Sequence, residues 1–360
     1  MSLRRARASE VPAEVLESAF GIAVPAVRRT YSGVIQPGPP PPGAWSATIG
    51  QPADDGARIV QVDQLDARTR DLTIESPALG SPPVAVKVRL LLPADFDAQP
   101  TTTWPVLYLL HGANDDYTSW TRSTDVEALT APDEVMVVMP TASLYNGAGG
   151  YADGWYSDWL NGGAGGPPAW ETFHLTELMQ LLERNFQAGD QHVVAGLSMG
   201  GYGALNYAAR HPDLFSAAAS YSGVLDLKVK PDDFTDAASI ARWGDPVANA
   251  DNWDAHNPIK FVSALKGKPL YVSYGNGQPG PLDPAGTQPD PLEQWIGQGS
   301  DLFVQAMNDA GVQATVNAYG PGTHSWPYWE RELHASLPML LQALGVTATP
   351  VASPAPSTGS

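Results

Sequence analysis

The chain has 360 residues, of which 43% are hydrophobic, so it is long enough to bury one large core and to carry a small appendage. Its net charge of −18 argues against nucleic acid or an anionic membrane as a partner, because both would repel it. The sequence contains no cysteine, which excludes disulfides, thiolate metal sites and cysteine nucleophiles, and no apolar run approaches the length of a membrane-spanning helix.

The first 56 residues are predicted to form an extension. Arginines at positions 4, 5 and 7 precede a mildly apolar segment at 15–27, but three glutamates lie between them and its apolar part. A secretory signal has a cleaner apolar centre, so we expect a short amphipathic helix here. The run QPGPPPPG at 36–43 predicts a stiff linker. We therefore expect an extension with a linker at 1–56, one catalytic domain at 57–346 and a disordered Pro/Ser-rich tail at 347–360.

From residue 58 onward the pattern is one of strands. Residues 58–65 predict the first, and 71–75 and 84–92 flank a Gly-Ser-Pro turn as an antiparallel pair. The continuous apolar runs at 106–110 and 135–139 are typical of strands buried on both faces. Further strands are predicted at 215–221, 270–274 and 314–319, and helices at 170–186, 301–309 and 329–344.

Alternating strands and helices over about 290 residues predict an α/β fold with a mostly parallel central sheet and helices on both faces. Three long Gly/Pro-rich loops, at 143–168, 226–258 and 276–290, are expected at the carboxyl edge of that sheet. Ligands bind at this edge in such folds, so we expect these loops to shape a substrate cleft.

The stretch QHVVAGLSMGGYGALNYAARHP at 191–212 carries the most specific signal. An apolar run turns sharply around Ser198 and continues as a small-residue helical pattern. A bulky residue two positions before or after that serine would clash with the strand or the helix, and Gly196 and Gly200 remove these clashes. A strand, a tight turn with a central serine and a helix form the nucleophile elbow of an α/β-hydrolase. This context favours a nucleophile over an incidental serine in a glycine-rich turn.

A serine hydroxyl is a poor nucleophile until a base takes its proton. In this fold the chain order is serine, acid, histidine, and the histidine lies in a loop after the last strand. Of the seven histidines, His324 has that position, after the turn Gly320-Pro321-Gly322. The acid should follow the strand at 270–274. Three carboxylates qualify by position, and the residues alone leave the choice open: Asp283, Asp290 and Glu293.

The oxyanion of a tetrahedral intermediate needs two backbone N–H donors. We expect one from Met199, which follows the serine, and the other from Ala113, in the loop after His111-Gly112. That His-Gly pair has a simpler interpretation as turn chemistry.

Aromatic residues near these positions are candidates for substrate binding. They either line an acyl or sugar subsite or pack loops onto the body of the protein. With His111, which lies at the mouth of a strand, the candidates are Trp155, Trp159 and Trp326.

At these positions the chain resembles the mycolyltransferase (antigen 85) family, within the wider esterase D-like group of α/β-hydrolases. The matches extend over about 58–344 and include Tyr156-Ser157-Asp158-Trp159, Gly196-Leu197-Ser198-Met199, Gly275-Asn276-Gly277 and Gly322-Thr323-His324-Ser325-Trp326. The resemblance implies Ser198 as nucleophile and His324 as base. It also selects Glu293 as the acid, since the family's catalytic glutamate keeps the same offset of 18 residues (293 − 275) from the first glycine of its G-N-G motif.

The first oxyanion loop departs from that family. It reads His111-Gly112-Ala113-Asn114, whereas the family usually has Asp-Gly with a nearby arginine that contacts trehalose. The nucleophile turn also has Gly200-Gly201, as in general esterases. The resemblance therefore implies acyl-serine chemistry and an extracellular or cell-envelope location, but not the trehalose acceptor.

These observations lead to three hypotheses. The first is a serine carboxylic-ester hydrolase and acyltransferase that works through an acyl-enzyme on Ser198, on a small-molecule, lipid or glycan ester. The second is a mycolyltransferase or diacylglycerol-type acyltransferase that moves long acyl chains to a sugar or glycerol hydroxyl. The third is a non-catalytic cell-wall binding protein on a hydrolase scaffold. We expect no cofactor and no metal ion, and the oligomeric state stays open.

Overall fold

The computed structural model describes residues 49–145, 151–228 and 236–347. The amphipathic helix predicted at 15–27, the linker at 36–43 and nearly all of the predicted tail lie outside these ranges. The last residues of the predicted extension contact the body of the protein: the backbone N–H of Gln51 donates to the side chain of Asn185, which donates back to the Gln51 carbonyl. No helix in the described ranges is long and apolar enough to cross a membrane.

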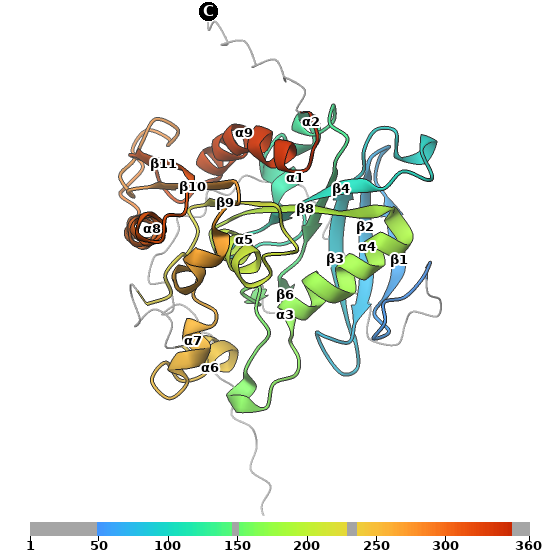
Figure 1. The fold of residues 1–360 in the computed structure, drawn as a ribbon, viewed down its shortest axis with the longest axis horizontal. Coiled ribbons are helices and arrows are strands. Elements are labelled where there is room, and N and C mark those ends of the chain that lie inside the picture. Colours follow the sequence, from blue (N-terminus) through green and yellow to red (C-terminus); the bar gives the residue numbers. More distant parts are fainter. Residues whose placement is uncertain (1–48, 146–150, 229–235, 348–360) are drawn as a thin grey trace, which may run out of the picture.

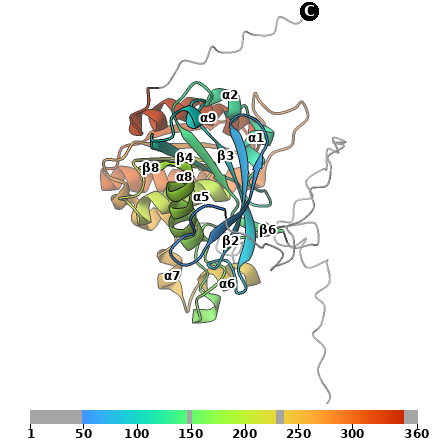
Figure 2. The same ribbon diagram turned by 90° about the vertical axis from the view of Figure 1, so that its right-hand side faces the viewer.

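A nine-stranded sheet forms the centre of the described chain, in the order β1-β2-β3-β5-β4-β8-β9-β10-β11 (Figure 1). β1 to β3 pair antiparallel with one another, β3 pairs antiparallel with β5, and all pairs from β5 to β11 are parallel. Figure 2 shows the twisted N-terminal strands at one edge. The strands are β1 (Arg58–Gln64), β2 (Thr69–Ser76), β3 (Val84–Leu91), β4 (Trp104–Leu110), β5 (Met136–Pro140), β8 (Ala188–Leu197), β9 (Ala217–Tyr221), β10 (Leu270–Gly275) and β11 (Thr315–Gly320).

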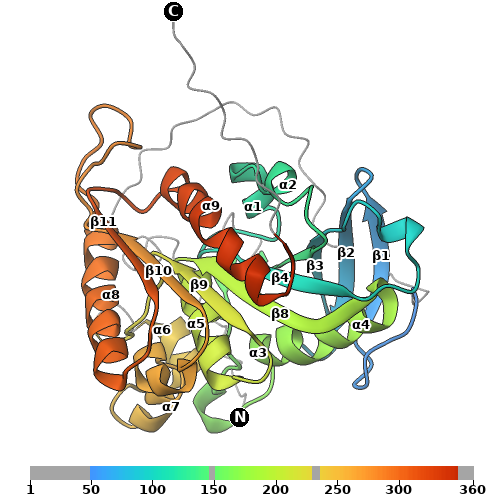
Figure 3. The same cartoon turned by 45° about the horizontal axis from the view of Figure 1, so that its top comes forward.

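Helices cover both faces of this sheet (Figure 3). One face carries α4 (Met179–Phe186), α5 (Met199–Arg210) and α8 (Pro291–Ala310), and the other carries α1 (Ser119–Ser123), α2 (Val126–Leu129) and α9 (Trp326–Ala343). β5, β9 and β10 are buried along their whole length, because parallel strands covered on both faces have no solvent side. The predicted parallel sheet with helices on both faces is thus confirmed.

The remaining elements lie mostly in loops. The helix predicted at 170–186 is continuous but contains a π-helical turn at Phe173–Leu178 between α3 and α4. The loops also hold short elements of three to eight residues that the sequence pattern did not predict, because segments this short show too few turns or alternations. They are β6 (Ser143–Tyr145), β7 (Tyr151–Asp153), α6 (Ala237–Trp243), α7 (Ala250–Asp254) and the 3₁₀ turns Phe96–Ala98, Asn161–Gly163 and Pro258–Leu265. α3 (Trp170–Thr172) is the start of the helix predicted at 170–186.

The prediction for the helix at 301–309 was wrong at its start, since α8 begins ten residues earlier (301 − 291). Gly297 interrupts the apolar pattern there, but a Cβ at this position would lie 2.5 Å from the carbonyl oxygen of Gly275 on β10. The glycine is therefore needed for close packing of the helix on the strand. The predicted start of the last helix was also late, because α9 begins at Trp326.

Close backbone contacts fix the turn between β8 and α5. A Cβ at Gly200 would lie closer than 3.0 Å to the carbonyl oxygen of Leu110 on β4, and one at Gly196 would be equally close to the carbonyl of Gly200. Both contacts are with backbone, which cannot rotate away as a side chain can. The sequence-based steric argument for these two glycines is confirmed.

We predict that Gly200→Ala lowers the melting temperature more than Gly267→Ala does. Gly267 has a φ of +87° but nothing within 4 Å of a built Cβ, so alanine there incurs only the backbone penalty of roughly 1 kcal/mol. Alanine at Gly200 forces main-chain displacement, which typically costs about 1–3 kcal/mol. Thermal unfolding followed by circular dichroism measures both. Equal losses would show that the turn has room for a methyl group.

Candidate active site

Ser198 lies between the end of β8 and the first residue of α5. Its φ of 52° and ψ of −121° are a strained conformation for a residue with a Cβ. The backbone N–H donates to the carbonyl of Tyr221 on β9 at 2.9 Å, which holds this turn against the neighbouring strand. The half-buried side chain sits at the N-terminus of α5, where the helix dipole favours negative charge.

The loop after β4 passes beside this serine. A Cβ built on Gly112 would lie 3.3 Å from the Cβ of Ser198, so the backbone of the loop is within reach of a group bound to the serine. The two predicted oxyanion donors lie on these two segments. Ala113 follows Gly112 in the loop after β4, and Met199 follows Ser198 at the elbow.

His111 is buried beneath this loop rather than exposed beside it. The backbone N–H of Ala142 donates to its Nε2 at 2.8 Å, so Nδ1 carries the proton and donates to the Gly112 carbonyl at 2.7 Å. The hydroxyl of Tyr156 donates to the His111 carbonyl at 2.9 Å. Both ring nitrogens thus bind backbone, and the geometry favours a loop-positioning role over the predicted contact with substrate.

His324 and Glu293 form the central hydrogen bond of the site. His324, in the loop between β11 and α9, donates from Nδ1 to Glu293 Oε2 at 2.6 Å. Glu293, in the first turn of α8, is fully buried. Its other oxygen, Oε1, accepts from the Gly275 backbone N–H at 2.6 Å and from Ser222 Oγ at 2.8 Å. Burial alone would raise the pKa of Glu293, but His324 and these donors outweigh it and hold the pKa below its ordinary value.

The two other candidate acids have different partners. Asp283 accepts hydrogen bonds from the hydroxyls of Thr323 and Tyr328, on either side of His324, without reaching the imidazole. Asp290 accepts from the backbone N–H of His324 through Oδ2 at 2.8 Å. Of the three carboxylates, Glu293 is the one bonded to the ring.

Asp290 is a residue whose role the sequence did not indicate. Its Oδ1 accepts from the backbone N–H groups of Leu292 at 2.9 Å and Glu293 at 3.3 Å, which caps the N-terminus of α8. One carboxylate therefore fixes both the helix that carries Glu293 and the backbone of His324. The Asp-Pro pair that begins α8 is a recognisable helix-start signal.

A short chain of contacts connects Ser198 to this pair. Ser198 binds the backbone of Tyr221, and the next residue, Ser222, donates to Glu293. The indole N–H of Trp329 donates to Ser222 Oγ at 3.2 Å, and its ring lies edge-on to His324 with centroids 4.8 Å apart. The segments that carry Ser198, Glu293 and His324 thus follow the carboxyl ends of neighbouring parallel strands, β8, β10 and β11.

The predicted aromatic residues fall into two groups. Trp326, which is half-buried at the start of α9, makes edge contacts with Trp120 and Trp329 beside the histidine loop. Trp155 and Trp159 instead pack around the guanidinium of Arg242, 5.6 and 5.7 Å from its central carbon. Burial lowers the pKa of Arg242 to about 10. This second group favours the packing interpretation, and sequence reasoning missed the arginine because only the fold brings it to these rings.

Residues 80–340 match the protein family described as "Putative esterase". Esterase Rv1288 of Mycobacterium tuberculosis (strain ATCC 25618 / H37Rv) is 31% identical over 303 residues, which cover 77% of this chain and 60% of that protein. The chain thus spans about 60% of the length of the first curated relatives it matches. A diacylglycerol acyltransferase/mycolyltransferase Ag85B of Mycobacterium leprae (strain TN) is 34% identical over 260 residues, 67% of this chain and 76% of that one.

Solved structures agree on the fold. An S-formylglutathione hydrolase from Agrobacterium tumefaciens superposes with a TM-score of 0.62 at 16% identity and covers 80% of this chain and 99% of its own. A ferulic acid esterase gives 0.60 at 23% identity, with coverages of 78% and 100%. At these identities the likeness concerns the fold alone, which is the α/β-hydrolase fold predicted from the sequence.

We predict that Asp290→Ala destabilises the protein more than Asp236→Ala. Asp236 is a matched control because it also caps a helix, α6, but accepts from a single backbone N–H, that of Ser239. Its removal should cost about 1 kcal/mol, as for other caps. Asp290→Ala also leaves the N–H of His324 without its acceptor, which adds about 1–3 kcal/mol. Urea unfolding gives both free energies, and equal values would contradict the bridging role.

Proposed function

The chain belongs to the "Putative esterase" family, and from that premise we propose that it is a serine carboxylic-ester hydrolase, also able to transfer acyl groups, that works through an acyl-enzyme on Ser198. The observation that carries this proposal is the 2.6 Å hydrogen bond from His324 Nδ1 to the buried Glu293. It fixes the ring tautomer so that Nε2 is the basic nitrogen, which is the arrangement that a serine nucleophile needs.

In the first half of the proposed reaction, Ser198 Oγ attacks the ester carbonyl carbon and its proton passes to His324 Nε2. The carbonyl oxygen becomes an oxyanion and accepts hydrogen bonds from the backbone N–H groups of Ala113 and Met199. Such a donor is typically worth about 10²–10³ in kcat. The negative charge of Glu293 stabilises the imidazolium. When the intermediate collapses, the ester C–O bond breaks and His324 returns the proton to the leaving alcohol.

In the second half, a water molecule or an alcohol hydroxyl attacks the acyl-serine. His324 takes the proton of the attacking group and returns it to Ser198 Oγ as the acyl–serine bond breaks. Water gives a free acid, and an alcohol gives a new ester. The same site therefore serves hydrolysis and acyl transfer, and the balance depends on which acceptor reaches the acyl-enzyme.

We favour hydrolysis of small-molecule esters over mycolyl transfer. The relatives' names include both esterases and acyltransferases. The loop His111-Gly112-Ala113-Asn114 contains no arginine, and the cationic Arg242 is buried among tryptophans. Neither provides the sugar-binding cation that the mycolyltransferase pattern places at the first oxyanion loop. An extracellular or cell-envelope location stays a prediction from the family resemblance.

We predict that a fluorophosphonate probe labels the wild-type chain and not Ser198→Ala. Ser198→Ala and His324→Ala should each lower kcat for ester hydrolysis by at least about 10³, and Glu293→Gln by less, because the acid acts through the histidine. Ser216→Ala is the control, since this hydroxyl donates to the carbonyls of His192 and Ala343, away from the site. Equal labelling of wild type and Ser198→Ala would end the proposal.

Esters of increasing acyl length separate hydrolysis from transfer. With p-nitrophenyl esters we expect kcat/KM to be highest for short acyl chains and to change little when trehalose is added, since the loop lacks the arginine described above. Product analysis by mass spectrometry measures acyl transfer directly. Acylated trehalose in excess of free acid would favour the mycolyltransferase alternative.

A further inference from the structure

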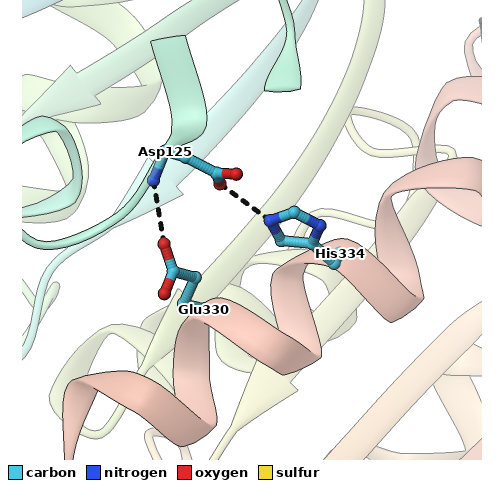
Figure 4. Close-up of side chains that lie close together, drawn as sticks. All are labelled: Asp125, Glu330 and His334. Carbon is cyan, nitrogen blue, oxygen red and sulfur yellow. Dashed lines mark hydrogen bonds and ion pairs between the residues drawn. The ribbon is translucent and has the colours of Figure 1, made fainter. Parts of the chain in front are cut away.

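Three potential metal ligands meet on the surface, outside the proposed catalytic trio. Asp125 precedes α2, and Glu330 and His334 lie on α9, four residues apart and therefore on one face of the helix. Figure 4 shows the two α9 side chains directed toward Asp125. One ligand atom from each residue lies within 4.8 Å of the others.

The present contacts hold this cluster together only in part. His334 Nε2 lies 2.7 Å from Asp125 Oδ1, and the backbone N–H of Asp125 donates to Glu330 Oε1 at 3.0 Å. The imidazole thus pairs with one carboxylate, while the other carboxylate accepts only from a neutral backbone N–H. With a protonated imidazole the three side chains still sum to −1, and with a neutral one to −2. Among the described residues, no lysine or arginine forms an ion pair with any of the three.

The donor set and its accessibility suit a divalent transition metal. Imidazole and carboxylate are both zinc ligands, with Zn–N and Zn–O distances of about 2.0–2.2 Å, which puts neighbouring ligand atoms about 3.3–3.5 Å apart. The His334 and Asp125 side chains are 38% and 48% exposed, so core packing does not lock them in their present rotamers. The open side leaves room for water as a fourth ligand.

We propose that Asp125, Glu330 and His334 bind a divalent transition-metal ion, with Zn²⁺ as the probe. The ion neutralises the two carboxylates and binds the imidazole of His334 at Nε2. It joins the loop before α2 to the second and third turns of α9. The first turn of α9 carries Trp329, which contacts His324. The site is structural and takes no part in the ester chemistry.

Calorimetric titration of the chelator-treated full chain with Zn²⁺ tests the proposal without substrate. We expect saturable binding of about one ion per chain and a rise in melting temperature. His334→Ala and Glu330→Gln should each weaken binding at least about tenfold, since even outer-shell losses have that effect. Co²⁺ supplies a second readout, because its visible absorption bands should depend on the same two residues.

His211→Ala is the matched control. His211 also pairs with a carboxylate, Glu171 at 2.5 Å, but Arg210 already neutralises that group, and within the described part of the chain no second carboxylate completes a three-ligand cluster there. This variant should bind Zn²⁺ with the same affinity as the wild type. The proposal is overturned if the wild type shows no saturable binding, or if both cluster variants bind Zn²⁺ as tightly as the wild type. It also fails if Ca²⁺ binds as tightly as Zn²⁺ and His334→Ala leaves both unchanged, since the imidazole would then not be a ligand.

Discussion

The site depends on keeping Glu293 ionised although its side chain is fully buried. Burying a lone carboxylate is costly, so the charge persists only where enough donors replace its hydration. Four groups from different parts of the chain do so: the His324 imidazole, the Gly275 backbone, and the hydroxyls of Ser222 and Tyr319. Because these groups come from the ends of β9, β10 and β11 and the loop after β11, the strands must be in register before the acid can be buried. The fold and the charge therefore stabilise each other.

Around Ser198, close contacts of the backbone fix the geometry, whereas around Glu293 hydrogen bonds to a charged group do so. Gly196 and Gly200 each occupy a position where a methyl group would meet backbone atoms within 3.0 Å, and a methyl group on Gly112 would meet the side chain of Leu197 at 2.7 Å. Gly297 has the same function on the acid side, where α8 rests on the carbonyl of Gly275 one turn after Glu293. The spacing of these segments is thus set mainly by contacts with backbone atoms, which move less readily than side chains do. This makes small residues as important to the geometry as the polar ones.

The sequence predicted what depends on local pattern and missed what depends on tertiary position. The parallel strands were predictable because continuous apolar runs such as those of β4 and β5 have few other interpretations. Turn chemistry and chain order were enough to propose Ser198 and His324. They did not select an acid, since Asp283, Asp290 and Glu293 all qualify by position, and only the family resemblance chose among them. The start of α8 was missed because Gly297 reads as a loop residue, although Asp290-Pro291 contained the helix-start signal.

Helix α9 contributes residues both to the surroundings of His324 and to the proposed metal site. Its first turn holds Trp329 against His324, and its second and third turns present Glu330 and His334 to Asp125. A ligand that binds only the folded chain stabilises it by an amount set by concentration and affinity, whatever the distance to the catalytic residues. The ligand changes the rate of the ester reaction only if α9 has two alternative positions that the ligand binds with different affinity. A ligand cannot shift an equilibrium between states that it binds equally. Trp329 donates a hydrogen bond to Ser222, which in turn donates to Glu293. These hydrogen bonds link α9 to the buried carboxylate, in addition to its ring contact with His324. That attachment favours a single position of the helix, and a metal ion bound to its second and third turns should then raise stability without altering turnover.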